Sequence, residues 1–542
     1  MGTNLSKLKR ESLIEKIKFI KEEILKTCNE ENRQIFIDYL NELEKELTRQ
    51  KYGLVFEEHE ENIDVIYQNN IDVLTEIEEL SIMNNSEKLN FLLEGDNLSA
   101  LRVLNKTHKK LIDVIYIDPP YNTGNKDFIY DDDCVDSLDT FRHSKWLSFM
   151  KKRLSLASTL LKEDGIIFIS IDDNEYAPLK ILCDDIFGES NYVSTIVWQK
   201  AFAPKNDNKY ISTSHEYILL YAKNKSKYKR NLLPRTEESN KGYKNPDNDP
   251  RGPWTSGTML ATTFSKSGVF GIQKPNGDIA YPPEGRCWRY SPERVKELIA
   301  DNRVYFGADG KNVPRVKRFL TEVQQGIVPQ SLWLHTEVGN NQNATNELQK
   351  ILGKQVFSFP KPSSLIKQCI KLHGNSNAII LDFFAGSGTT GDAVMQLNNE
   401  DGGNRKFILC TNNENNICRE ITYERIKRVI ERDNYDDSLK YFKIDYIETS
   451  EKLYYEYANE LLYHIRELVE LENGVSFEQC NNLKIILTDE ELDSFIEENN
   501  SNVIRLYIGH DVLLDESLKI KLHKKGIDIV MIPDYYYAEM RG

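Results

Sequence analysis

The sequence predicts an α/β fold in which a mostly parallel central sheet carries helices on both faces. Three stretches, Leu111–Ile117, Gly165–Asp172 and Ala378–Phe384, are short, apolar, rich in β-branched residues and bounded by turn residues, as buried strands are. Helical apolar spacing follows two of them, over Trp146–Leu161 and Gly391–Leu397. This alternation of strand and helix is typical of a sheet whose neighbouring strands are parallel.

Length and composition restrict the class of protein. At 542 residues the chain is too long for one core, so two to four domains are expected. No apolar run approaches the roughly 18 residues that span a membrane, and residues 1–10 lack the apolar core of a signal peptide. The eight cysteines form no C-x-x-C pair, which argues against a zinc or dithiol site and favours a reducing, intracellular setting. We therefore expect neither a metal site nor a membrane contact.

The charge of the chain is unevenly distributed. A net charge of −15, taken alone, argues against a nucleic-acid binder. Residues 200–367, however, hold 27 Lys and Arg against 15 Asp and Glu. A basic middle between acidic ends is compatible with a local nucleic-acid contact.

The first half of the chain predicts its elements in a regular order. Residues 1–85 are highly charged and have the apolar spacing of two amphipathic helices, which indicates a packing or dimerisation arm. The stretch Leu89–Leu104 predicts a strand, a turn at Gly95-Asp96 and a helix. From about 230 to 355, Gly, Pro, Asn, Lys, Arg and Trp dominate without a helical period, which predicts a loop-rich insertion with a small core of its own.

The second half returns to α/β texture. Arg405–Thr411 predicts a strand with Glu414 just past its end, and residues 417–431 predict a helix. Residues 451–472 predict a helical segment, and three short strands follow it. The predicted domains are therefore a helical N-terminal arm (1–85), two halves of one α/β domain (86–229 and 356–450), the insertion (230–355) and a C-terminal α/β domain (451–542).

The tetrad Asp118-Pro119-Pro120-Tyr121 lies at the carboxyl end of a predicted strand, where open α/β sheets bind ligands. The exocyclic amine of adenine is a poor nucleophile because its lone pair is conjugated with the ring. A carboxylate at Asp118 and the rigidly directed carbonyl of Pro119 are suited to accept its two protons and aim the lone pair. The ring of Tyr121 is suited to stack on an extruded base. The simpler alternative is a Pro-Pro turn that caps a strand, with Asp as a turn residue.

The second motif, Phe384-Ala-Gly386-Ser387-Gly388, follows a strand and opens a helix. Its glycines allow close approach to the backbone, and the helix N-terminus offers free N–H donors. Asp382 precedes it, and Glu414 is placed to accept from both hydroxyls of a ribose. A nucleoside-type ligand is favoured. A plain packing turn remains open, and so does a dinucleotide site, because Gly391 completes the pattern G-x-G-x-x-G.

Together the two motifs resemble an amino-group DNA methyltransferase that uses S-adenosylmethionine. Asp-Pro-Pro-Tyr resembles the adenine-N6 form, whereas cytosine-N4 enzymes more often have Ser first. The catalytic motif precedes the cofactor loop with a variable region between them, an order that resembles the β class. Ile117–Gly124, Leu381–Thr390 and Asn399–Ile408 look like modification (Mod) subunits of type III restriction–modification systems. The resemblance covers about residues 86–435 and implies a Rossmann-like sheet of the S-adenosylmethionine-dependent methyltransferase type.

The resemblance also implies roles for individual residues. It makes the tetrad from Asp118 to Tyr121 the catalytic pocket and Glu414 the ribose ligand. It assigns Asp96 to the cofactor's adenine, although Gly-Asp turns are also common structural features. In Phe359-Pro-Lys361-Pro362 it implies a motif that packs on the methionine moiety of the cofactor. The remaining cofactor-binding residues that we predict are Asp382, Phe384, Gly386, Ser387 and Gly388.

The expected partners follow from the same resemblance. They are double-stranded DNA with a flipped-out adenine, a second copy of the chain and a restriction (helicase–nuclease) subunit, in the bacterial cytoplasm. The insertion takes the place of the target-recognition region, where Arg286, Arg289 and Lys317 are candidates that the sequence does not distinguish. Two alternatives stay open. In the first, the chain has the same fold but acts on cytosine N4, RNA or a protein amide; the protein amide is disfavoured because the motif begins with Asp. In the second, the chain is mainly a DNA-reading scaffold for a restriction subunit.

Overall fold

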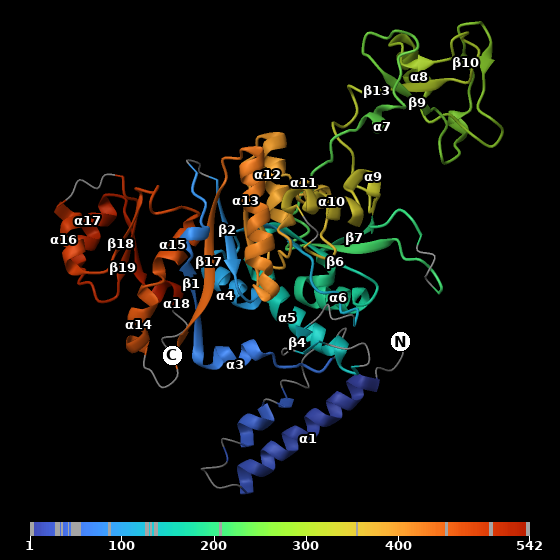
Figure 1. Ribbon diagram of the computed structural model, residues 1–542. Helices are drawn as coiled ribbons and strands as arrows, with labels where there is room; N and C mark the ends of the chain where they lie inside the picture. The colour runs from blue at the N-terminus through green and yellow to red at the C-terminus, as the bar shows by residue number, and fades with distance from the viewer. Residues whose placement is uncertain are drawn as a thin grey trace.

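The computed structural model describes residues 5–27, 33, 36–41, 43–44, 56–84, 88–124, 129–130, 133–134, 139–204, 209–353, 356–449, 454–497 and 502–537. Its centre is a ten-stranded sheet in the order β1-β17-β2-β16-β15-β3-β6-β8-β7-β14 (Figure 1). These strands are β1 Asn70–Glu76, β2 Leu89–Glu94, β3 Ile112–Ile117, β6 Leu161–Ile171, β7 Tyr192–Gln199, β8 His215–Ala222, β14 Leu332–Trp333, β15 Ile379–Asp382, β16 Lys406–Thr411 and β17 Ser438–Glu448.

The middle of the sheet is parallel, as predicted. Every neighbouring pair from β17 through β2, β16, β15 and β3 to β6 is parallel, whereas β1 and β8 run antiparallel to their neighbours. All residues of β2 and β3 are buried. Continuous apolar runs form such strands because helices cover both faces of a parallel sheet.

Two layers of helices cover the sheet. On one face α4, α5 and α6 pack with the C-terminal helix α15, and on the other α10, α11, α12 and α13 form a second core. The bounds are α4 Asn97–Thr107, α5 Arg142–Leu160, α6 Tyr176–Cys183, α9 His335–Val338, α10 Asn341–Leu352, α11 Ser363–Lys371, α12 Thr389–Asp401, α13 Glu424–Asp433 and α15 Ile465–Asn473. Short π and 3-10 turns lie at 184–191 and 414–423.

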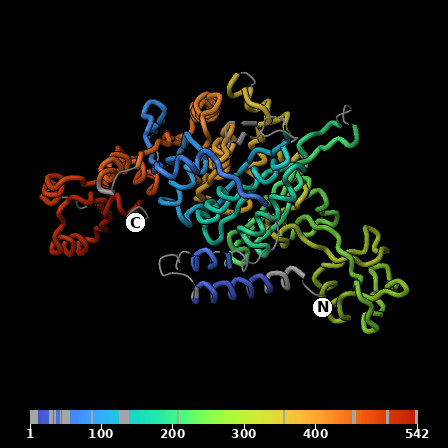
Figure 2. The backbone as a smooth tube through the Cα atoms, turned by 90° about the horizontal axis from the view of Figure 1, so that it is seen from below, coloured from blue at the N-terminus to red at the C-terminus, as the bar shows by residue number. Residues whose placement is uncertain are grey.

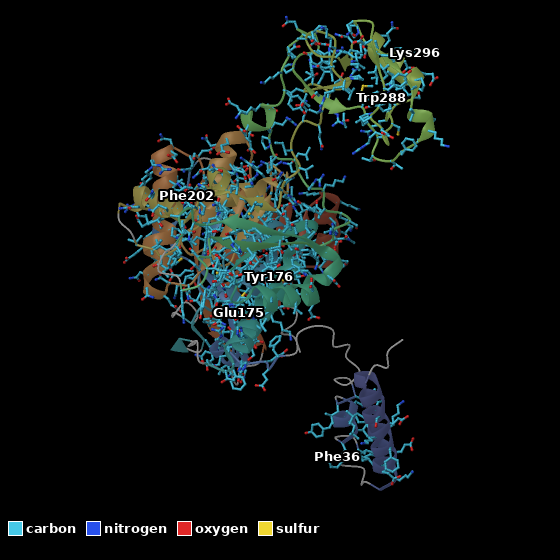
Figure 3. All side chains as sticks on the ribbon, turned by 90° about the vertical axis from the view of Figure 1, so that its right-hand side faces the viewer. Phe36, Glu175, Tyr176, Phe202, Trp288 and Lys296 are labelled. Atoms are coloured by element: carbon cyan, nitrogen blue, oxygen red, sulfur yellow. The ribbon has the colours of Figure 1, made fainter. Side chains whose placement is uncertain are left out.

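The predicted insertion is a separate lobe that stands away from the sheet (Figures 1 and 3). It has its own apolar core, which includes Met259, Trp288 and Leu298. The chain enters and leaves the lobe at one paired point, where Leu233 and Ile327 exchange two backbone hydrogen bonds of 3.0 and 2.8 Å. The lobe holds α7 Glu237–Asn240, β9 Trp254–Thr258, β10 Ile272–Gln273, β11 Ile279–Ala280, α8 Pro292–Ala300, β12 Val304–Tyr305 and β13 Arg315–Phe319.

The predicted end of the insertion at 355 is wrong. β14 pairs with β7 in the central sheet, and α10 packs its apolar face, with Leu348 and Ile351, into the second core. Residues 332–352 therefore belong to the central domain. The amphipathic spacing of α10 is the sequence feature that separates this stretch from the loop-rich lobe.

Charged residues of the lobe divide into two groups. The Lys317 side chain is fully buried and forms ion pairs with Asp249, at 3.0 Å, and with Asp247. Its role is therefore inside the lobe, and it is not a candidate for DNA contact. Arg286 and Arg289 are exposed.

The N-terminal part differs from the helical arm predicted for 1–85. α1 (Leu5–Thr27) stands apart from the sheet in Figure 3. Residues 62–76, by contrast, form α3 (Asn62–Asn69) and β1, the edge strand that pairs with β17. Of the predicted second amphipathic helix, the described residues 36–41 and 43–44 are helical.

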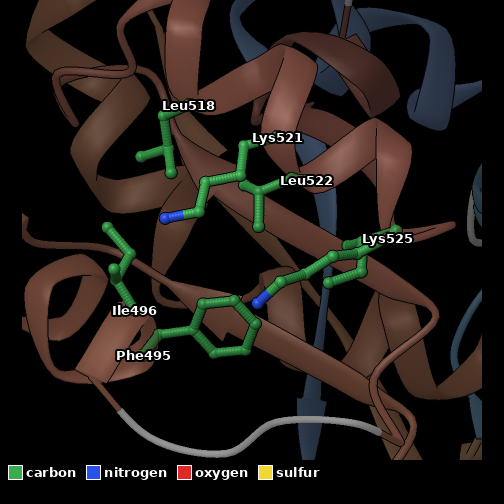
Figure 4. Close-up of a pocket in the computed structure, with 7 residues that line it drawn as sticks. Phe495, Ile496, Leu518, Lys521, Leu522 and Lys525 are labelled. Atoms are coloured by element: carbon green, nitrogen blue, oxygen red, sulfur yellow. The ribbon is translucent and has the colours of Figure 1, made fainter.

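The C-terminal domain contains the three predicted strands in one parallel sheet, β18-β19-β20. Figure 2 shows this domain and the lobe at opposite ends of the central sheet. Its elements are α14 Tyr454–Leu462, β18 Leu483–Ile486, α16 Asp489–Glu497, β19 Arg505–Gly509, α17 Glu516–Lys524, β20 Asp528–Ile532 and α18 Asp534–Tyr537. A pocket between α16 and α17 is lined by apolar side chains, which include Phe495 and Leu522, and by Lys521 and Lys525 (Figure 4).

In the part of the chain that the structure describes, none of the helices is long and apolar enough to cross a membrane. That same part of the chain holds no group of three His, Cys, Asp or Glu side chains arranged to bind a metal ion.

Candidate active site at the carboxyl edge of the sheet

The predicted site residues follow four strands that are neighbours in the sheet. β2, β16, β15 and β3 lie side by side and parallel. Asp96, Glu414, the Phe384–Gly388 loop and Asp118 come directly after these strands in that order. Residues as far apart as 96 and 414 are therefore brought to one edge of the sheet.

The connections that leave β3 and β15 diverge. β3 is followed by α5, which packs on one face of the sheet, and β15 is followed by α12, which packs on the other. Since the two strands are adjacent, their loops separate at the carboxyl edge, which in open α/β sheets is where a ligand-binding crevice forms. The tetrad and the glycine loop form its two sides.

Asp118 is held by charge-assisted bonds. Lys361 Nζ donates to both carboxylate oxygens at 2.8 and 2.7 Å, and the Tyr121 hydroxyl lies 2.9 Å from Oδ1. Lys361 is 8% exposed and the Asp118 side chain 25% exposed. Breaking such a pair by removal of one partner typically costs about 3–5 kcal/mol.

A second carboxylate completes this cluster. Glu216, on β8, is buried and accepts from Lys200 Nζ at 3.0 Å. Its other oxygen lies 3.1 Å from the Tyr121 hydroxyl and 3.7 Å from Lys361 Nζ. Tyr121 has one proton to share between Asp118 and Glu216, so its ring is fixed between the two carboxylates.

Burial and charge set the protonation of the cluster. Burial raises the pKa of Tyr121 well above its usual range, and both neighbouring carboxylates raise it further. Burial alone lowers the pKa of Lys361, but the charges of Asp118 and Glu216 outweigh it and the pKa is raised. Burial alone raises the pKa of Glu216, but Lys361 and Lys200 outweigh it and the pKa is lowered. At neutral pH the tyrosine is therefore neutral, and Glu216 and Lys361 are charged.

The backbone of the tetrad is fixed from behind. The carbonyl of Pro120 accepts from the buried Trp146 indole at 2.7 Å. Among the residues that the structure describes, no hydrogen bond reaches the carbonyl of Pro119. Asn122 is buried with a φ of 56°, and its amide donates to Glu175 at 2.5 Å, which holds the turn after Tyr121.

The glycine loop has the conformation that its sequence predicts. Gly386 and Gly388 have φ of 47° and 73°, a region that L residues rarely adopt. A Cβ atom at Gly388 would lie 3.2 Å from the carbonyl oxygen of Thr422, so a side chain there would be strained twice. Ser387 is buried beside Thr389, and the half-buried Phe384 ring lies 5.9 Å from that of Phe149. The loop leads into the N-terminus of α12, where free N–H groups favour an anion.

Asp382 shapes this loop from below. Its carboxylate accepts from the Phe384 amide at 3.0 Å and from the Thr390 hydroxyl at 2.5 Å. The side chain is buried, and burial raises its pKa to about 7, with the nearby Asp118 adding to the shift. Asp382 is thus a support of the loop, and its carboxyl group titrates near neutral pH.

Asp96 and Glu414 differ in how their side chains are used. Asp96 caps α4 by accepting from the Leu98 amide at 2.7 Å, and Arg153 lies 3.4 Å from its other oxygen. It therefore has a structural role whether or not it also contacts a ligand. Glu414 is exposed at the start of a 3-10 turn, beyond β16.

The segment before α11 brings Lys361 and Pro362 to the site. Both are buried, and Pro362 is the N-cap residue of α11. Phe359, two residues earlier, has a φ of 57° and a side chain that is 77% exposed. A phenylalanine in that conformation is strained, and such strain often marks ligand-binding segments.

Sequence reasoning missed several residues of the site. Glu216 and Lys200 were not predicted, nor was Trp146 given a role in the site. The available signal was an acid inside the strand His215–Ala222, since a carboxylate within an apolar run requires a buried cation as partner.

Comparison with known proteins agrees with this geometry. The sequence model of a family described as DNA methylase, of the N6/N4 kind, matches residues 112–424, which is more than half of the chain. This chain belongs to the DNA methylase family. The match begins at the first residue of β3 and ends at the first residue of α13, so it covers both motifs.

Three relatives are informative about this family member. The Mod subunit of the StyLTI type III restriction-modification enzyme of Salmonella typhimurium is 39% identical over 394 residues, which are 66% of this chain and 59% of that protein. The EcoPI Mod subunit of Escherichia phage P1 is 34% identical over 61% of this chain and 58% of its own length. The type II methyltransferase M.KpnI of Klebsiella pneumoniae is 34% identical over 70% of this chain and 95% of its own length.

These matches confirm the predicted resemblance to type III Mod subunits. The DNA methylase described here spans somewhat less than three-fifths of the two Mod subunits that it matches.

We predict that Asp382 makes the stability of the methylase fall as pH rises. Its pKa of about 7 in the folded state is above the value near 4 of an unfolded Asp, so the folded state holds the proton more tightly. This contribution is fully present below about pH 4 and is lost as pH rises to about 7, at up to about 1.4 kcal/mol per pH unit. Denaturant unfolding of wild type and Asp382→Asn from pH 4.5 to 7.5 measures it.

The Asp382→Asn variant is expected to lack this part of the slope, because the amide does not titrate. Asp164→Asn, at an exposed acid, is the control and should follow wild type. Parallel pH profiles for wild type and Asp382→Asn would show that Asp382 ionises normally.

Proposed function

We propose that this chain is a site-specific DNA methyltransferase that transfers a methyl group from S-adenosylmethionine to the N6 amine of a flipped-out adenine. The observation that carries the proposal is the adjacency of β3 and β15, which sets Asp118 and the glycine loop on two sides of one crevice. Membership of the DNA methylase family supports it. The relatives that are Mod subunits support a role as modification subunit of a type III restriction–modification system.

The glycine loop fits S-adenosylmethionine. Gly386 and Gly388 carry no side chains and have positive φ, so a ligand can approach this turn of the backbone closely, and the N-terminus of α12 suits the carboxylate of the methionine part. Glu414 is exposed and available to the ribose hydroxyls, and the exposed Phe359 ring to an apolar part of the ligand. When bound, this cofactor supplies an electrophilic methyl group.

The tetrad orients the amine. Asp118 accepts a hydrogen bond from one N–H of the amine, and the carbonyl of Pro119 accepts a hydrogen bond from the other. These two contacts favour the pyramidal nitrogen and direct its lone pair across the crevice. As the nitrogen becomes cationic, the Asp118 carboxylate stabilises the charge. The cationic nitrogen then loses a proton to solvent water, and no strong base is needed because this nitrogen is acidic. The Tyr121 ring, fixed by Asp118 and Glu216, offers a face for the base.

Lys361 competes with the amine for the oxygens of Asp118. Its ammonium bonds both carboxylate oxygens, and the Glu216 carboxylate is the neighbouring acceptor at 3.7 Å. A small displacement of Nζ toward Glu216 frees Asp118 while the ammonium stays paired. Glu216 is thus a positioning residue that acts through Lys361 and Tyr121.

Substitution of Asp118 tests the proposed chemistry. Asp118→Ala and the closer isostere Asp118→Asn are expected to lower turnover on duplex DNA by about 10²-fold or more, because an electrostatic contact to the developing cation is lost. Binding of S-adenosylmethionine should change little, since the glycine loop is untouched. Mass analysis of nucleosides should find N6-methyladenine with wild type. N4-methylcytosine without N6-methyladenine would contradict the adenine assignment, and near-normal turnover of both variants would contradict the role of Asp118.

Substitution of Glu216 tests the positioning role. Glu216→Gln keeps an acceptor for Tyr121 but removes the charge that draws Lys361 from Asp118, so kcat is expected to fall about 10- to 100-fold with little change in KM for the cofactor. Glu163→Gln, at an exposed ion pair with Lys227 on the same domain, is the matched control. An equal loss of cofactor affinity in Glu216→Gln would point to a structural defect instead.

We further propose that the chain works in the cytoplasm with DNA, as a homodimer and with a restriction subunit. Two relatives are named as subunits of restriction-modification enzymes, and this supports a partner for the chain. Light scattering of the full chain is expected to give about twice its 62.9 kDa mass. A monomer at micromolar concentration would contradict the dimer.

A further inference from the structure

The loop that joins β7 to β8 presents three apolar side chains to solvent. Tyr210 and Ile211 are each 85% exposed and Phe202 is 73% exposed. Figure 3 labels Phe202, whose ring lies 5.1 Å from that of His335. Single exposed apolar residues are common, but three strongly exposed ones on the same loop favour a contact surface.

The root of this loop is part of the proposed catalytic site. Lys200, the first residue after β7, donates to Glu216 at 3.0 Å, and Glu216 lies 3.1 Å from the Tyr121 hydroxyl. The Ala201 amide bonds the Ser214 carbonyl at 3.2 Å and closes the hairpin just above that contact. The exposed side chains therefore begin two residues from a group that contacts the catalytic cluster.

The position of the loop also relates it to the lobe. Both project from the end of the sheet formed by β8, β7 and β14, away from the C-terminal domain (Figures 1 and 2). Lys209 Nζ lies 5.2 Å from the centroid of the Tyr210 ring, so a positive charge accompanies the exposed apolar side chains. A positive charge at this place is suited to a polyanion such as DNA.

The proposed reaction requires side chains that stabilise the duplex while the target adenine is outside it. The N6 amine of a paired adenine is inside the base stack, so the nucleotide has to rotate out of the duplex before Asp118 can reach it. Rotation leaves a gap in the stack, and its neighbours lose their stacking partner. Aromatic and aliphatic side chains fill such gaps in duplex DNA, and aromatic side chains stack on bases of any sequence.

We propose that Tyr210 and Ile211, together with Phe202 of the same loop, form a wedge that enters the DNA duplex at the position vacated by the target adenine. The proposal rests on the proposed function and deepens it. Lys209 contacts a flanking phosphate, and the fixed root of the hairpin sets the distance between the wedge and Asp118. The partner of this surface is thus the duplex next to the target base.

The test compares two substrates that differ in the cost of base rotation. One duplex contains the methylation site, mapped by sequencing DNA from an expressing host, with the adenine paired to thymine. The second is identical except for an abasic position opposite the adenine, which lowers the cost of extrusion. The variants are Tyr210→Ala/Ile211→Ala and, separately, Phe202→Ala.

The double variant is expected to lose about 10- to 100-fold in kcat/KM on the paired duplex and less than about threefold on the abasic duplex. Phe202→Ala should show the same pattern with a smaller loss. Because these side chains are exposed, the thermal midpoint should not change. Leu513→Ala, at an 81% exposed leucine of the C-terminal domain, is the matched control and should act on both substrates like wild type.

Other outcomes overturn the wedge. Equal losses on both substrates would assign the loop to general DNA binding, and unchanged activity would show that it does not take part. A change of oligomeric state in the double variant, without rescue by the abasic substrate, would assign the surface to a second copy of the chain. If wild type methylates neither duplex, the proposed function itself fails. Asp118→Asn is the catalytic control and should lose most of its activity on both substrates.

Discussion

The ion pair between Lys361 and Asp118 is the interaction on which the site depends. It joins the segment before α11 to the end of β3, across 243 residues of sequence. Through Glu216 it also fixes β8 and the Tyr121 ring. Two lysines and two carboxylates in this cluster leave it without net charge, which is why four ionisable groups are stable at a largely buried position.

The sheet explains how such distant segments form one site. β15 and β3 are neighbours, and the helices that follow them leave toward opposite faces. The ends of both strands are therefore uncovered at the same edge. Asp382 and the Gly386–Gly388 turn hold one side of the crevice, and Trp146 and Asn122 hold the other from behind.

Much of this arrangement could be predicted from the sequence, for physical reasons. β2, β3, β15 and β16 were predicted because parallel strands buried on both faces are continuous apolar runs. The glycine loop was predicted because positive φ restricts the choice of residue. β1 was missed because it is a mixed strand within a charged region, and its place is fixed only by pairing with β17. The sequence does not reveal that Glu216 and Lys317 are buried charges. Their partners, Lys200 and Asp249, lie elsewhere in the sequence and have the same residue types as surface charges.

The paired point at Leu233 and Ile327 has a consequence for how such proteins diversify. All hydrogen bonds that hold the Asp118 cluster lie outside residues 234–326. Recombination of genes at the two ends of this interval would exchange the lobe as a cassette and leave the chemistry intact. A lineage can in this way replace the lobe in one genetic event, without passing through intermediates that lack the Asp118 cluster.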